Sequence, residues 1–579
     1  MHIRIYTVTF FCKFLLYFCS LFAGTIAYAQ TIIGYDFLDT NNIRARFNAP
    51  GDLFWDWNNG ATYFEIPKGS GRGTVYISDL WIGGKDAGGQ LHMAANFYRN
   101  GTDFYQGPVM NTPSYSSIQD SIWNRVWKIN KSTVDSFRWG FFSSIPPEIL
   151  NWPGNGDTTA GQAKTLAPFY DADNDGLYNP YAGDFPCIRG DQAVFFIFND
   201  DRDVHTETKA LRMGIEVRGM AYEINDPSNE AINNTLFLHY SIINRSAAVY
   251  NNTYLGLWAD MDLGCYNDDY MGCDVKRSAF YAYNGDNNDD SVCASPGYGN
   301  LLPAQGIVIL KGPEADAGDG LDNNRDCTVD EPGETIDLSH FLNFQSDFSD
   351  TGLPQADTAY YNYLRGIWID GTPLTYGGSG HKSGGDACAF VFPGQSDHPI
   401  EWGTGGNCQA PGYPQYDWSE DQLGNPPGDR KGVGGAGPFT FSPGEEICFD
   451  AAFVFAQSAG GNPMQSLYKL QNSIDSVQAY FDAGLNHCIC VPGPLGLRDS
   501  RVPEVAALFP NPSGDYLFIR TGMPGQAVYT IFSSTGQAVM HGTLVRQNEQ
   551  LNISALAPGF YLMQLSGNTH TFTSKFIRN

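Results

Sequence analysis

The sequence predicts a mainly β protein: β-sandwich domains in tandem, one amphipathic helix and a small C-terminal β-sandwich. Three observations support this prediction. Hydrophobic residues make up 42% and aromatic residues 14% of the 579 residues, which supplies apolar surface for buried sheets. The 65 glycines and 33 prolines are typical of a chain with many turns. Charged residues reach only 17%, which argues against a coiled coil or a long helical array.

The charge balance excludes one class of partner. The 62 acidic residues outnumber the 34 basic ones, and the formal net charge is −28. Nucleic-acid-binding domains carry a basic surface, so we expect no nucleic acid among the partners.

Residues 1–29 predict a secretory signal peptide. Arg4 and Lys13 are the only charged residues of the segment, and an apolar run fills residues 14–26. The sequence AYA at 27–29 is a small-x-small cleavage site. A membrane anchor is the alternative, but the apolar run is short for a membrane span.

Two regions follow the signal peptide. Residues 30–165 are rich in aromatic residues and glycine, and residues 75–84 predict a strand that ends in a glycine turn. Aromatic side chains can stack on sugar rings, but they more often fill a β core. Residues 166–490 predict a central β-sandwich with strands at 194–198, 211–224, 235–243, 254–259, 306–310 and 448–456.

One helix is predicted near the end of the central region. Asn462 is its N-cap, Pro463 its first residue and Gly484 its end. Its apolar residues recur at spacings of three and four, which places them in one stripe: Leu467, Leu470, Ile474, Val477 and Phe481. We expect the stripe to pack on the sandwich.

The end of the chain predicts a separate unit. Residues 491–504, which include PGPLG at 492–496, form a linker, because proline and glycine interrupt regular elements. Residues 505–579 predict a small antiparallel β-sandwich with strands at 516–520, 527–533, 538–544, 559–566 and 571–577.

This last segment resembles the C-terminal sorting domain of the type IX secretion system of Bacteroidota. The matching motifs are FPNP at 509–512, STGQ at 534–537, LAPGFY at 556–561 and KFI at 575–577. The resemblance implies that residues 505–579 engage the type IX secretion machinery and that the protein crosses the outer membrane. It also implies a secreted or cell-surface product, which is either anchored to surface lipopolysaccharide or released.

The loop DADNDGLYN at 171–179 is a candidate calcium site. Carboxylates at loop positions 1, 3 and 5, a glycine at position 6 and an oxygen at position 9 match an EF-hand-like pattern. Position 12 departs from the pattern, because Ala182 replaces the usual carboxylate, for which Asp184 could substitute. The alternative is a solvated turn. The candidate ligands are Asp171, Asp173, Asp175 and Asn179.

A second candidate calcium site is the loop at 319–331, DGLDNNRDCTVDE. It resembles the aspartate-rich repeats of bacterial surface proteins for which metal binding is proposed. Cys327 stands where an EF-hand has glycine, so this is no true EF-hand, and a solvated turn held by Cys327 is the alternative. The candidate ligands are Asp322, Asn324, Asp326 and Asp330. At both loops we expect calcium with a structural role.

A third acidic cluster contains Asp260 and Asp262, which would share one face of a strand. Three roles stay open for it: a metal site, a structural cluster, or the general acid and base of a glycosidase. The neighbouring acidic residues are Asp268, Asp269 and Asp274.

Of the twelve cysteines, Cys12 and Cys19 lie in the predicted signal peptide, and the ten that remain are an even number, compatible with disulfides in an exported protein. The sequence does not reveal their pairing. Cys265 and Cys273 flank an acidic loop that a bridge between them could close. We interpret Cys488 and Cys490 as halves of two bridges to different partners.

No catalytic motif stands out in the sequence. HExxH, GxSxG, a Walker loop and GxGxxG after a strand are all absent. Residues 30–490 also resemble an uncharacterised group of large secreted proteins that carry the same sorting domain, which brings no known activity. We therefore expect a non-catalytic secreted or surface cargo, stabilised by calcium, that is adhesive or contacts a glycan. The alternative is a secreted hydrolase, either a glycosidase or a peptidase.

Overall fold

The computed structural model describes most of the chain from residue 33 onward. The described ranges are 33–138, 140–142, 144–290, 293, 296–396, 417–484, 506–509, 512–521, 527–533, 537–544, 548–566 and 571–579. The predicted signal peptide, the predicted linker, Cys408, Cys488 and Cys490 lie outside them. Two compact units make up the chain: Met1–Lys131 with Phe142–Cys490, and Ser132–Phe141 with Val491–Asn579.

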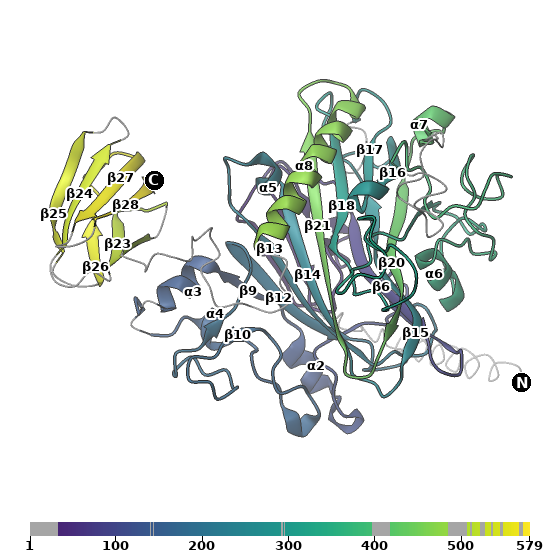
Figure 1. Ribbon diagram of the computed structural model, residues 1–579, viewed down its shortest axis with the longest axis horizontal. Coiled ribbons are helices and arrows are strands. Elements are labelled where there is room, and N and C mark those ends of the chain that lie inside the picture. Colours follow the sequence, from purple (N-terminus) through teal and green to yellow (C-terminus); the bar gives the residue numbers. More distant parts are fainter. Residues whose placement is uncertain are drawn as a thin grey trace, which may run out of the picture. The chain divides into compact units, whose positions relative to one another are not determined.

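The first unit is built around two antiparallel sheets (Figure 1). The larger has the order β16 (Asp269–Asp274), β17 (Ala279–Asn284), β18 (Pro303–Lys311), β21 (Glu446–Gln457), β14 (Thr235–Asn244), β13 (Ile215–Glu223), β12 (Gln192–Asn199) and β8 (Tyr105–Gln106), with β9 (Trp127–Asn130) also paired to β12. The smaller has the order β19 (His340–Phe344), β20 (Arg430–Phe441), β15 (Tyr250–Met261), β6 (Ile77–Lys85) and β7 (Leu91–Ala95). Strands of the two predicted regions, 30–165 and 166–490, therefore share both sheets.

Short elements surround these sheets. The remaining strands are β1 (Tyr35–Leu38), β2 (Arg44–Asn48), β5 (Phe64–Glu65), the pair β3 (Trp55–Asp56) and β4 (Ala61–Thr62), and the pair β10 (Phe169–Tyr170) and β11 (Phe185–Pro186). The short helices of this unit are η1 (Thr112–Ser114), α2 (Ser117–Trp123), α4 (Pro147–Leu150), η2 (Thr158–Ala160), α5 (Glu230–Asn233), η3 (Val275–Arg277), α6 (Asp357–Leu364) and α7 (Glu420–Leu423). Apart from Lys131, the helix α3 (Lys131–Arg138) belongs to the second unit.

The main core lies between the two sheets. Alternate residues of each strand point into it, because successive side chains of a strand face opposite sides. Phe196 and Leu238 of the larger sheet and Leu257 of the smaller one belong to this single buried cluster. The predicted parity of the 211–224 segment is confirmed, since Met213, Ile215 and Val217 are all fully buried in the same core.

The outer face of each sheet is also covered. α6 and the loops around it lie on the smaller sheet, where Trp81, Trp258 and Tyr360 form part of a second, aromatic-rich cluster. The helix α8 (Pro463–Gly484) lies on β18 and β21 of the larger sheet (Figure 1). A strand that is covered on both faces has a continuous apolar sequence, as β12 has.

The predicted helix is confirmed. α8 begins at Pro463, the Oδ1 atom of Asn462 accepts a hydrogen bond of 2.9 Å from the Met464 N–H, and Gly484 is the last residue. All five residues of the predicted stripe are buried: Leu467, Leu470, Ile474, Val477 and Phe481.

One interior strand of the smaller sheet, β20, was missed by the sequence patterns, because it is rich in glycine. β20 lies between β19 and β15. A Cβ at Gly434 would come within 2.7 Å of the Phe280 ring, and a Cβ at Gly432 within 2.9 Å of the Phe341 ring. Glycine is required there, since aromatic rings pack directly on the backbone of the strand.

The second unit is a small sandwich of two sheets. One has the order β22 (Ala506–Phe509), β23 (Tyr516–Thr521) and β26 (Asn548–Asn552), and the other β25 (Ala538–Leu544), β24 (Ala527–Ser533), β27 (Gly559–Ser566) and β28 (Thr571–Arg578). All five predicted strands are confirmed, while β22 and β26 were not predicted. Ile519, Ile531 and Phe576 are fully buried in its core.

Truncation of α8 tests its packing on the larger sheet. Leu470→Ala removes a fully buried side chain, so we expect the free energy of unfolding to fall by about 2–5 kcal/mol in urea denaturation. The matched control is Tyr468→Ala, because Tyr468 is 60% exposed on the same helix and should change stability by about 0.5 kcal/mol or less. Equal losses in both variants would contradict the observed orientation of the helix.

Candidate functional site

The first acidic loop connects β10 to β11 and is closed by its own carboxylates. The Asp171 carboxylate accepts hydrogen bonds from the N–H groups of Asp175 at 3.2 Å and Gly176 at 2.7 Å. Asp173 accepts from the Asp175 N–H, and Asp175 accepts from the Leu177 N–H. Two residues of the loop, Asn174 and Gly176, have positive φ angles of 61° and 72°. The loop therefore wraps around its first carboxylate.

The second acidic loop repeats this conformation position by position. Asp322 accepts from the N–H groups of Asp326 at 3.1 Å and Cys327 at 3.0 Å, four and five residues ahead, as Asp171 does. Asn324 and Asp326 accept from residues two ahead, as Asp173 and Asp175 do. The φ angles of Arg325 and Cys327 are 60° and 80°. Cys327 thus adopts the left-handed backbone of the glycine that it replaces.

Three carboxylates converge in the first loop. Asp171, Asp173 and Asp184 each place an oxygen within 4.8 Å of the others. Asp184 is fully buried and accepts from the N–H groups of Ala172 and Asn179, which fixes its position. It takes the place of the carboxylate missing at position 12.

The other predicted ligands do not complete such a group among the described residues. The Oδ1 atom of Asp175 accepts from Leu177, and that of Asn179 accepts from the Tyr181 N–H at 3.1 Å. In the second loop, the Oδ1 atom of Asp330 accepts from the Gly320 N–H at 3.1 Å. No three acidic, histidine or cysteine side chains of residues 319–331 converge as those of the first loop do.

The third acidic cluster joins Asp260 and Asp262 to Asp429, which precedes β20. The Tyr98 hydroxyl donates a hydrogen bond of 2.6 Å to the Oδ2 atom of Asp260. The Nζ atom of Lys431 lies 3.2 Å from the Oδ1 atom of Asp260 and 2.5 Å from the Oδ1 atom of Asp429. One lysine therefore contacts two of the three carboxylates.

These three carboxylates line a cavity of about 630 Å³. Burial raises the pKa of Asp260 to about 6, although Lys431 opposes the shift. Burial and then repulsion from Asp260 and Asp429 raise the pKa of Asp262 well above its usual range. Two adjacent carboxyl groups thus have different proton affinities, which is a feature of acid–base sites.

The nearby acidic residues have other partners. The Oδ2 atom of Asp268 accepts from the Asp290 N–H, and that of Asp269 accepts from the Leu263 N–H. Asp274 pairs with Arg277 at 2.8 Å. They bind the backbone or a salt-bridge partner.

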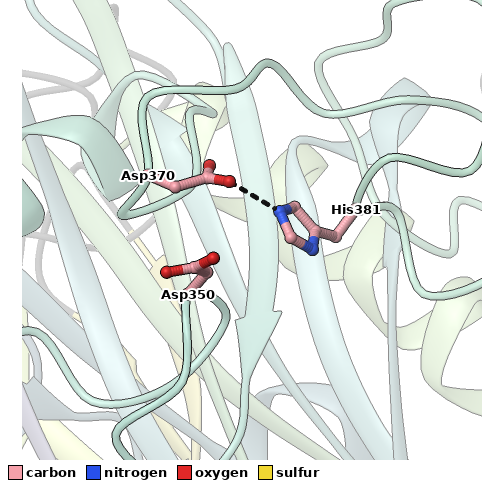
Figure 2. Close-up of side chains that lie close together, drawn as sticks. All are labelled: Asp350, Asp370 and His381. Carbon is pink, nitrogen blue, oxygen red and sulfur yellow. Dashed lines mark hydrogen bonds and ion pairs between the residues drawn. The ribbon is translucent and has the colours of Figure 1, made fainter.

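A fourth group was missed by the sequence patterns. Figure 2 shows the imidazole of His381 directed at the carboxylate of Asp370, with Asp350 beside them. The Nε2 atom of His381 lies 3.0 Å and the Nζ atom of Lys382 lies 2.5 Å from the Oδ2 atom of Asp370. Although partial burial opposes the shift, hydrogen bonds from Lys382, Thr372 and His381 hold the pKa of Asp370 well below its usual range. Asp350, Asp370 and His381 follow no short sequence motif, so the sequence patterns could not identify them as a group.

One cysteine prediction is wrong. Cys265 is bonded to Cys293, not to Cys273. The bridge closes a 28-residue separation, because β16 and β17 form a hairpin between the two cysteines. Cys187, Cys327 and Cys448 are also disulfide-bonded.

Comparison with protein families identifies the second unit. Residues 507–579 match the secretion system C-terminal sorting domain. The chain carries a sorting domain. It is therefore exported as a type IX secretion cargo to the cell surface or the medium.

The sorting domain joins two of its motifs in space. Tyr561 of LAPGFY pairs with Phe576 of KFI in the β27–β28 register, and their rings stack with centroids 5.5 Å apart. The Tyr561 hydroxyl donates to the Ala557 carbonyl at 2.8 Å, which closes the LAPGFY turn.

The other comparisons add no argument about activity. No curated protein matches the chain. A solved structure described as a polysaccharide lyase aligns with 63% of this chain and 34% of its own length, at 7% identity and a TM-score of 0.17. The chain thus spans about a third of that protein, and so low a score supports no conclusion. Among the described residues, no helix is both long and apolar enough to cross a membrane.

Removal of the sorting domain tests its role in export. A chain that lacks residues 507–579 should accumulate in the periplasm of a type IX-competent host, whereas the full chain reaches the surface or the medium. Cell fractionation with surface proteolysis measures the distribution. Surface delivery of the truncated chain would contradict this role.

The pKa of Asp262 predicts a pH dependence of stability. The folded state holds a proton on Asp262 above the pH at which an unfolded aspartate, with a pKa of about 4, loses it. Stability should therefore fall as the pH rises from about 4 through the folded pKa. The side chain introduced by Asp262→Asn is neutral at every pH. The free energy of unfolding of this variant, measured by urea denaturation, should be close to that of wild type at pH 4 and higher than that of wild type by about 1 kcal/mol or more at pH 8.

The control for this measurement is Asp203→Asn, which alters an exposed carboxylate. It should leave the pH dependence unchanged. An Asp262→Asn profile parallel to wild type would show that Asp262 is ionised in the fold.

Proposed function

We propose that the cargo unit is a non-catalytic surface or secreted protein, stabilised by calcium at its two acidic loops, that contacts a glycan. One observation carries this proposal: two loops of different sequence adopt the same carboxylate-centred conformation. Such a conformation aims side-chain oxygens inward, which suits a hard cation with six to eight oxygen ligands.

The first loop has the stronger ligand set. Asp171, Asp173 and Asp184 converge, each with an oxygen within 4.8 Å of the others. Burial and then repulsion from Asp175 and Asp184 raise the pKa of Asp173, although a backbone hydrogen bond opposes the shift. A bound cation would relieve this repulsion, so calcium would favour the folded loop.

The position of the first loop makes a structural role reasonable. Tyr178 is buried, packs on the Phe169 ring at 5.3 Å and donates a 2.6 Å hydrogen bond to the Ile149 carbonyl. Calcium would thus fix a loop that anchors a neighbouring segment of the unit.

Glycoside hydrolysis is a second candidate function. Asp260 and Asp262 line a cavity, and retaining glycosidases hold their two carboxyl groups only about 5 Å apart. The non-catalytic proposal is favoured because Tyr98 and Lys431 already bind the Asp260 carboxylate.

Calcium should raise the melting temperature of the mature chain. A ligand that binds only the folded state at 100 times its dissociation constant adds about 2.7 kcal/mol of stability. Thermal unfolding in calcium and in a chelator measures the shift. Asp173→Asn and Asp326→Asn should each reduce it, while Asp203→Asn, outside both loops, should preserve it. Equal melting temperatures for wild type in both buffers would refute the calcium sites.

A further inference from the structure

The cavity at Asp260 lies outside the two acidic loops. It is bounded by the end of β15, by the residue before β20 and by residues 60–73 around β4 and β5. Its volume of about 630 Å³ is within the range of small-molecule sites. Its lining combines carboxylates with aromatic rings, among them Tyr63, Tyr76 and Tyr266.

The carboxylates of the cavity leave acceptors unused. Asp260 is 6% exposed, and the partner of its Oδ1 atom is the Lys431 ammonium group at 3.2 Å, which leaves room for a further donor to this oxygen. No described residue donates a hydrogen bond to Asp262. Buried acceptors without donors cost free energy, so a ligand that donates hydrogen bonds here would be stabilised.

The charges of the cavity favour a neutral ligand over a cation. Lys431 already contacts Asp260 and Asp429 with its ammonium group. Arg44 and Arg72 also line the cavity, so its wall is not uniformly negative. Hydroxyl groups meet the need for donors without adding charge.

The aromatic lining favours a ring with apolar faces. The Tyr76 hydroxyl accepts a 3.1 Å hydrogen bond from the Nε1 atom of Trp55, which holds its position. Sugar rings present C–H faces to aromatic rings and carry hydroxyls at their edges. A sugar can therefore contact both the aromatic rings and the carboxylates of the cavity lining.

We infer that this cavity binds a neutral sugar residue, whose hydroxyls donate to Asp260 and Asp262 while its ring packs on Tyr76. This inference rests on the glycan contact of the proposed function and names its site. Calcium at the acidic loops is independent of it.

The test uses the mature chain in calcium. A glycan array with neutral and uronate-containing oligosaccharides identifies a ligand, and calorimetry with that oligosaccharide measures affinity. Asp262→Ala and Tyr266→Ala should each weaken binding by 10-fold or more. Tyr266 is 37% exposed, so its truncation should leave the fold intact. The control Asp350→Ala removes an exposed carboxylate of another cluster and should bind as wild type does.

The outcomes separate this inference from the proposed function. Absence of neutral glycans among the ligands, or unchanged affinity in both cavity variants, would overturn the inference and leave the calcium result standing. Binding accompanied by release of reducing ends would support the site but overturn the non-catalytic proposal. Binding without turnover would support both.

Discussion

The packing of the nine-stranded sheet on the five-stranded sheet is the interaction on which the other features depend. Phe196, Leu238 and Leu257 are nearly or fully excluded from water in this interface. Because helices and loops also cover the outer faces, the central strands β13, β14 and β21 are buried on both sides. Asp260 lies near the end of β15 and both acidic loops lie outside the sheets, whereas a buried ion pair between His239 and Asp450 joins β14 and β21 within the larger sheet.

Local patterns predicted much of this fold, and non-local packing accounts for what they missed. The stripe of α8 and the strands of the sorting domain follow from spacing alone, as Leu470 and Ile531 illustrate. β20 could not be predicted in this way. Its glycines Gly432 and Gly434 are explained by close contacts with side chains distant in sequence, among them the rings of Phe280 and Phe341.

The distinction between local patterns and non-local packing also applies to the acidic loops and the cavity at Asp260. The acidic loops were predictable because their first carboxylates, Asp171 and Asp322, bind backbone four and five residues ahead, and Asp184 was identified from its proximity in sequence. The cavity was only half predictable. Asp260 and Asp262 were visible as a pair, but Asp429 and Lys431 join them through the β15–β20 register, in which Asp260 lies opposite Lys431.

The excess of carboxylates makes the stability of the fold depend on both bound protons and bound cations. Burial raises the pKa of Glu223 to about 8 and that of Asp289 to about 7, so these groups hold their protons to a higher pH in the folded chain than in the unfolded chain. Such groups make the fold less stable as the pH rises from about 4 to 8, because the unfolded chain then releases its protons more readily. Calcium at the proposed sites would act in the opposite sense, since its ligands must be ionised. Bound calcium would therefore offset, at neutral pH, the cost of the buried carboxyl groups, which gives an acidic exported chain a physical reason to keep its acidic loops.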